Sequence, residues 1–244
     1  MLPILDFGFI QVPTFFLVLS LLMGLVFYLT TYRSRQLNMN ENEALDLALV
    51  LVLTALIGAR LAHVVFENWD YYYASPSKVV FFWEGGFVFY GGFILSFASG
   101  IIFLGLKRKL SNLKHYMQLF TPILSLSYVI GRIGCFLEGC CYGKFCTLPW
   151  AVHGRHPTQL YSTVLETAVL VFLLTYELRN QAALKKYPER LFYIWLFFHS
   201  LSRGSIEFLR DDFRGNSPLV SLSTWISIVL MILAANYFYR HRKI

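Results

Sequence analysis

The chain has 244 residues, of which 57% are hydrophobic and only 14% are charged. An average soluble domain carries about 25% charged residues, so this composition excludes an ordinary water-soluble domain and indicates a polytopic membrane protein. The formal net charge of +7 is compatible with either a nucleic acid or a membrane surface, and the positions of the charges decide between them.

Seven apolar runs are long enough to cross a hydrocarbon core of about 30 Å. We predict transmembrane helices over residues 13–32, 44–66, 86–106, 116–134, 159–178, 190–209 and 219–239. Helices are expected because the runs are long and continuous, unlike the short alternating strands of a barrel. The predicted fold is therefore all-α, with seven transmembrane helices in a single domain over residues 1–244.

Lysine and arginine are unevenly distributed among the predicted loops. Of the 21 basic residues, thirteen fall on one side, five on the other and three inside spans. The positive-inside rule then predicts an external N-terminus and a cytoplasmic C-terminus. Because this charge is explained by topology and contact with anionic membrane lipids, we expect no nucleic-acid partner.

Three arginines lie inside predicted spans, at positions 60, 132 and 203. An ionisable side chain at the centre of a membrane helix costs about 2.5–3.5 kcal/mol or more, and it normally faces the bundle interior or an aqueous cavity. Arg60 shares a helical face with His63 and Glu67, although snorkelling toward the external end is an alternative explanation.

The sixth predicted span carries His199, Arg203 and Glu207 on one face, at i, i+4 and i+8. Arg203 and Glu207 are spaced to form an ion pair, which on its own would serve only helix packing. The histidine one turn away favours a functional site. Arg132 lies between Gly131 and Gly134, which permit close approach, and arginine is suited to binding phosphate. Together these arginines predict an anion site for a phospholipid phosphate.

Two further motifs carry polar groups. The segment HPTQLY, residues 156–161, has the form of a helix start with Thr158 as the N-cap. The cysteines Cys135, Cys140, Cys141 and Cys146 follow a C-x4-C-C-x4-C spacing that matches no common metal framework. Small apolar packing, a disulfide and a metal-binding or nucleophilic thiol remain open for them.

Five ordered motifs resemble those of the prolipoprotein diacylglyceryl transferase family, almost from end to end. They are GARLAHVVFENWDYY (58–72), FWEGGFVFYGG (82–92), GRIGCFLEGCCYG (131–143), RHPTQLYS (155–162) and RGSIEFLRDD (203–212). The family frame also has seven spans and an external N-terminus, in agreement with the charge distribution. The resemblance implies a multi-pass protein of the bacterial inner membrane.

The chain departs from the family pattern at several positions. Tyr90 stands where many members have a histidine, and Cys135 and Cys140 stand at the signature Asn and Glu. Three further differences are Phe15 and His199, which stand in place of tyrosines, and Ser162, which stands in place of a glutamate. The segment between Gly143 and His156 is also shorter than in many members.

The resemblance implies a reaction without metal or nucleotide cofactor. The lipobox cysteine of a prolipoprotein signal peptide attacks the phosphate-bearing glyceryl carbon of phosphatidylglycerol, a thioether forms and glycerol phosphate leaves. The implied catalytic residues are Arg132, Arg203, Glu207, His199 and His156. The implied substrate-binding residues are Arg60, Tyr90, Gly91, Gly92, Gly131, Gly134, Glu138, Gly139, Gln159 and Tyr161.

Three other interpretations stay open at this point. One is a non-catalytic relative that binds phospholipid or lipoprotein precursor, favoured by the joint loss of the signature Asn, Glu and His. Another is a seven-helix transporter or photoreceptor, but residues 219–239 contain no lysine for a retinal Schiff base. The last makes the cysteines themselves a base or a transient acceptor.

Overall fold

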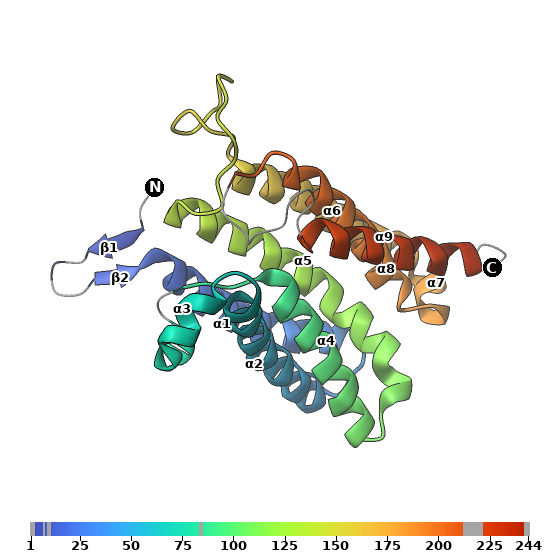
Figure 1. The fold of residues 1–244 in the computed structure, drawn as a ribbon. Helices are drawn as coiled ribbons and strands as arrows, with labels where there is room; N and C mark the ends of the chain where they lie inside the picture. Colours follow the sequence, from blue (N-terminus) through green and yellow to red (C-terminus); the bar gives the residue numbers. More distant parts are fainter. Residues whose placement is uncertain (1–2, 7, 9–10, 83–84, 212–221, 242–244) are drawn as a thin grey trace. The chain divides into compact units, whose positions relative to one another are not determined.

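The computed structural model describes residues 3–6, 8, 11–82, 85–211 and 222–241. A two-stranded antiparallel sheet of β1 (Ile4–Asp6) and β2 (Gln11–Pro13) precedes the helices. The helices are α1 (Thr14–Gln36), α2 (Glu41–Phe66), α3 (Trp69–Ala74), α4 (Phe89–Leu106), α5 (Leu113–Glu138), α6 (Thr158–Arg179), α7 (Gln181–Lys186), α8 (Arg190–Glu207) and α9 (Leu222–Arg240) (Figure 1). Short 3-10 turns lie at Pro76–Val80 and Leu110–Asn112.

Within the described residues, α1, α2, α4, α5 and α6 are long and apolar enough to cross a membrane. The protein is therefore an all-α membrane protein, with one small sheet that the sequence did not predict. The predicted spans 190–209 and 219–239 correspond to α8 and α9, except that residues 219–221 lie outside the described part of the chain.

The helix α5 is longer than the predicted span 116–134. It runs to Glu138, so Cys135 and Glu138 are helical rather than part of a connecting segment. The helix ends at Gly139, whose φ of 83° is left-handed, and the backbone N–H of Cys140 donates to the carbonyl of Cys135. This is a Schellman ending, so Gly139 serves as the helix stop signal.

The helices form two compact groups, one within residues 27–116 and one within residues 1–26, 117–213 and 219–244. In the first group α2 and α4 lie side by side (Figure 1). A Cβ on Gly58 would lie 2.6 Å from the carbonyl oxygen of Gly91, and a Cβ on Gly92 would lie 2.7 Å from that of Ala55. Glycine is needed here because the two backbones touch, as in small-residue packing of membrane helices.

Arg60 fixes the segment that connects these two helices. Its side chain is 2% exposed and donates to the backbone carbonyls of Lys78, Val79, Phe81 and Gly85. Its guanidinium also lies 5.1 Å from the ring centroid of Tyr72. The cost of burying this cation is thus offset by carbonyl dipoles and an aromatic ring.

In the second group α8 packs against both α6 and α9 (Figure 1). The interior of this group contains Leu173, Leu191 and Trp195, each 1% exposed or less. The segment from Gly139 to Pro157 extends beyond the ends of α5 and α6 and folds back through bridges from Phe145 and Val152 to Arg155. Gly143 pairs with Arg210, which ties the base of this segment to the end of α8.

Candidate active site

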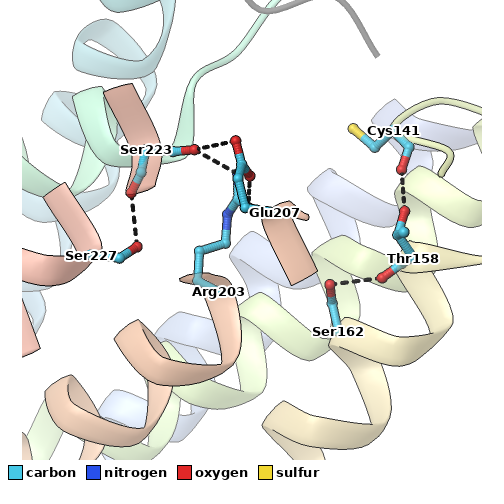
Figure 2. A network of polar contacts seen from close by, with 7 residues as sticks. All are labelled: Cys141, Thr158, Ser162, Arg203, Glu207, Ser223 and Ser227. Atoms are coloured by element: carbon cyan, nitrogen blue, oxygen red, sulfur yellow. Dashed lines mark hydrogen bonds and ion pairs between the residues drawn. The ribbon is translucent and has the colours of Figure 1, made fainter. Parts of the chain in front are cut away.

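The best-connected polar network lies at the end of α8. Arg203 and Glu207 form an ion pair one turn apart, with side chains 8% and 7% exposed. The hydroxyl of Ser223, on α9, donates to Glu207 Oε1 over 2.8 Å and accepts from Arg203 Nη2 over 3.3 Å (Figure 2). The predicted pairing of Arg203 with Glu207 is therefore confirmed, and α9 supplies a third member that the sequence did not indicate.

A second buried pair lies further along the same helix. Nδ1 of His199 is 2.8 Å from Oε2 of Glu166, on α6, and both side chains are 1% exposed. The other oxygen, Oε1, accepts from Ser125 and Trp195, both over 2.8 Å. Sequence reasoning missed Glu166, although it lies inside a predicted span, and the criterion that selected the three arginines would have found it.

Tyr128, on α5, joins these groups to Arg132. Its ring meets the ring of His199 edge to face, with centroids 4.6 Å apart, and the Arg132 guanidinium carbon lies 4.8 Å from the Tyr128 centroid. Tyr128, Glu166, His199 and Arg203, with Ser162, Ser202 and Ile206, line a crevice that is too narrow to hold a water molecule. The structure thus brings the predicted residues Arg132, His199, Arg203 and Glu207 to a common region through a tyrosine that was not predicted.

Arg132 differs from Arg60 and Arg203 in its partners. Within the described residues it forms no ion pair with a carboxylate, whereas Arg203 is paired and Arg60 is surrounded by carbonyls. A Cβ added to the neighbouring Gly131 would meet no atom within 4 Å, so the space beside the arginine is open. Arg132 is therefore a half-buried cation without a carboxylate partner in the described part of the chain.

The start of α6 is held by side chains rather than by the expected cap. Thr158 is the first helical residue and not the N-cap, because its hydroxyl donates to the carbonyl of Cys141 over 2.7 Å (Figure 2). Gln159 is 1% exposed and donates to the carbonyl of Cys140. These two residues position the turn after α5, which explains why they are buried and polar.

His156 and Tyr161 also lie at this end of α6. The hydroxyl of Tyr161 accepts from the indole N–H of Trp150 over 2.9 Å and lies 3.3 Å from Nδ1 of His156. Described contacts do not join His156 to the crevice. The two residues form a polar aromatic cluster at the base of the 139–157 segment.

Several predicted substrate-binding residues have structural contacts in the described chain. Gly91 and Gly92 lie at the contact of α2 and α4, and Gly139 ends α5. A Cβ on Gly134 would lie 3.2 Å from Val18, so this glycine lets α5 approach α1. Tyr90 is 4% exposed within the group of residues 27–116.

Glu138, the last residue of α5, has an unusual carboxylate. Its Oε2 is buried and accepts no hydrogen bond within the described part of the chain. A buried carboxylate oxygen without a donor is costly, so such atoms usually await a ligand or a donor that arrives later.

All four cysteines carry free thiols. Hydrogen bonds with Cys135 and Cys140, followed by the positive charges of Arg132 and Arg210, hold the pKa of the Cys141 thiol well below its usual range. Hydrogen bonds with Cys135 and Cys141, with burial, raise the pKa of Cys140.

Fold and site together define an all-α membrane protein with an arginine-rich polar centre between its helices. The sequence model of the prolipoprotein diacylglyceryl transferase family matches residues 3–240, and the chain belongs to that family.

Relatives in several bacteria carry the name phosphatidylglycerol–prolipoprotein diacylglyceryl transferase. The protein of Clostridium tetani is 30% identical over 217 residues, which cover 84% of each chain. That of Streptococcus mutans is 30% identical over 221 residues, covering 86% of this chain and 83% of the relative. A protein of Clostridium perfringens, named as transferase 2, is 32% identical over 211 residues, covering 82% and 79%.

Proposed function

We propose that this protein transfers the diacylglyceryl group of phosphatidylglycerol to the lipobox cysteine of bacterial prolipoproteins. The family match and the shared name of its relatives support this activity. In the reaction, the precursor thiolate attacks the glyceryl carbon that bears the phosphate and a sulfur–carbon bond forms. The carbon–oxygen bond to phosphate breaks, and glycerol phosphate leaves with the electron pair.

The observation that carries the proposal is the environment of Arg132. A half-buried guanidinium with no carboxylate partner in the described chain, next to open space at Gly131, is suited to binding a phosphate. Negative charge grows on the phosphate as the carbon–oxygen bond breaks, and a fixed cation in a low-dielectric site stabilises that charge. We assign phosphate binding and leaving-group stabilisation to Arg132.

Arg203 supplies a second positive charge, in the crevice that Tyr128 and His199 line. Its ion pair with Glu207 and its contact with Ser223 hold the guanidinium in one orientation, so no reorganisation is needed when the transition state forms. Glu207 and Ser223 are therefore positioning residues, and Arg203 is the catalytic group.

The thiol must lose its proton, because the thiolate is the nucleophile. We assign the proton acceptor to His199 rather than His156, because His199 lies in the crevice and Nδ1 is held by Glu166. With the proton of the neutral imidazole on Nδ1, the basic lone pair is on Nε2. Glu166 orients the ring and stabilises the imidazolium that forms.

The contacts of the remaining predicted residues favour supporting roles. Arg60, Gly91 and Gly92 build the α2–α4 group, while Gln159 and Gly139 shape the turn beside Arg132. We keep Glu138, His156 and Tyr161 as contacts for the signal peptide, because they lie around the 139–157 segment.

The proposal includes the membrane arrangement. We infer seven spans, with α8 and α9 as the last two, an external N-terminus, and a location in the bacterial inner membrane. The one-sided distribution of lysine and arginine supports this orientation. A fluorescent protein fused to the C-terminus should fluoresce in the cytoplasm, and an alkaline phosphatase fusion there should be inactive.

Complementation of a bacterium depleted of its own transferase tests the activity. The native chain should restore growth, while Arg203→Ala, inserted at the same level, should not. Failure of a well-inserted native chain would overturn the proposal and favour a relative that only binds lipid or precursor.

A further inference from the structure

Three thiols converge where α5 ends. The sulfur atoms of Cys135, Cys140 and Cys141 all lie within 4.8 Å of one another, while Cys146 stands outside this group. None of the three is in a disulfide. Cys140 and Cys141 are adjacent and follow Cys135 by five and six residues, so they meet it only because the backbone reverses direction after Glu138.

The reversal is built by the backbone and fixed by the neighbouring helix. Gly139 and Cys141 have left-handed φ values of 83° and 60°, and the second is uncommon for a residue with a side chain. Thr158 and Gln159 donate to the carbonyls of Cys141 and Cys140, which hold both peptide groups in place. The thiol cluster is therefore organised before any ligand arrives, which lowers the ordering cost of binding.

The charges around the cluster suit an anionic metal–thiolate group. The guanidinium groups of Arg132 and Arg210 both interact electrostatically with Cys141. Three thiolates around a monovalent cation carry a net charge of −2, and around a divalent cation −1. Arg210 offsets part of that charge in a partly buried place, where an uncompensated anion would be costly.

We propose that Cys135, Cys140 and Cys141 form a binding site for a soft metal ion, Cu⁺ or Zn²⁺. Thiolate sulfur selects these ions over hard cations. At a zinc–sulfur distance of about 2.3 Å and tetrahedral angles, the sulfur atoms would stand about 3.8 Å apart, so the cluster must contract by only about 1 Å.

Binding is a proton exchange without oxidation. Each coordinating thiol loses its proton to solvent, a metal–sulfur bond replaces the sulfur–hydrogen bond, and the charge of the ion is unchanged. Cu⁺ can be complete with the three sulfurs, whereas Zn²⁺ takes water as the fourth ligand. The spacing of the cysteines matches no common metal framework, because the turn at 139–141 is what brings the three sulfurs together.

The test uses the full-length protein, reduced and purified in detergent, with Zn²⁺ alone or Cu⁺ alone against a competing chelator. Thiol alkylation mapped by mass spectrometry then reports each cysteine. We expect about one ion per chain and at least about tenfold slower alkylation of Cys135, Cys140 and Cys141, with Cys146 unchanged as the internal reference. The ion whose titration shows both the stoichiometry and the slower alkylation is the one that the site binds.

Two variants complete the test. Cys146→Ser should bind like the native chain, and the triple variant Cys135→Ser, Cys140→Ser, Cys141→Ser should bind none. The proposal would be overturned if the metal slowed the alkylation of Cys146 equally, or if it did not slow the alkylation of the three thiols. A disulfide among the three in the unreduced protein would also overturn it. Metal stoichiometry and thiol alkylation are measured on the native chain, so they require neither a well-folded triple variant nor transferase activity. The metal site can therefore fail or hold independently of the proposed function.

Discussion

Nδ1 of His199 lies 2.8 Å from Oε2 of Glu166, and both side chains are almost fully buried. Ser125 and Trp195 donate to the other carboxylate oxygen, so partners on two helices, α5 and α8, hold this carboxylate of α6. A carboxylate held in this way cannot rotate away from the imidazole. The pair is therefore a fixed unit that joins α6 to α8 beside Tyr128.

If His199 accepts the thiol proton, replacing this histidine should affect turnover more than substrate binding. We expect His199→Gln to lower kcat by about a hundredfold, within the usual range for loss of a general base, with KM little changed. Glu166→Gln should lower kcat by less and shift the pH–rate profile, because the ring remains but loses its carboxylate partner. Steady-state kinetics across a pH series measures both effects.

His156→Gln is the matched comparison for that series. His156 contacts Tyr161 outside the crevice, so its replacement should alter KM for the precursor peptide more than kcat. Loss of turnover in His156→Gln with retention in His199→Gln would reverse the assignment of the base.

Replacing Arg132 tests the phosphate site. We expect Arg132→Ala to lower kcat by a factor of about 10²–10³, as for loss of one preorganised charge-stabilising group. Arg132→Lys should recover only part of this, because an ammonium cannot bind phosphate in a bidentate manner. Product formation by purified protein is the measurement. Arg179→Gln, at an exposed position on α6, is the control and should remain fully active. Full activity of Arg132→Ala would contradict the assignment.

Removing the carboxylate partner of Arg203 should destabilise the fold. Glu207→Ala leaves a guanidinium that is 8% exposed without its ion-pair partner, and breaking a buried pair costs about 3–5 kcal/mol. The double variant Arg203→Met, Glu207→Met should be more stable than Glu207→Ala, although inactive. Unfolding in a mixed detergent titration compares them, and equal stability of Glu207→Ala and the native chain would show that the pair is not needed for the fold.

The α2–α4 contact predicts a glycine requirement. Gly91→Ala places a methyl group against Ala62 and the Gly58 carbonyl, so we expect destabilisation of about 1–3 kcal/mol. Gly105→Ala, in the same helix, meets no atom within 4 Å and should be neutral or slightly stabilising. The same unfolding titration gives the difference, and similar midpoints for both variants would contradict the packing role.

The helices were largely predictable from the sequence because apolar runs and membrane thickness set their lengths. The Arg203–Glu207 pair was predictable as well, since i, i+4 spacing places both side chains on one face. The end of α5 was not predictable. The helix continues four residues past the predicted end at 134, and its stop depends on where a glycine can adopt a left-handed φ. Thr158 looked like an N-cap from its position before an apolar run, but a carbonyl of the preceding turn bound its hydroxyl instead.

The contacts between distant residues could not be predicted. Arg60 has the same sequence signal as Arg132, an arginine in an apolar helix, yet backbone carbonyls surround only Arg60. Tyr128 and Arg132 are spaced i, i+4 on α5, but the ring contact of Tyr128 with His199 joins two helices and has no sequence pattern. Glu166 could have been predicted from the sequence, because burying a carboxylate in a predicted span is as costly as burying an arginine there.

The most direct test of the central claim is a transfer assay with the purified protein in phosphatidylglycerol vesicles and a lipobox peptide. The account predicts one diacylglyceryl group on the peptide cysteine for each glycerol phosphate released. It also predicts no product with a Cys→Ser peptide and a strong loss with Arg132→Ala. A native protein that binds both substrates but forms no thioether would contradict the account and identify a non-catalytic relative.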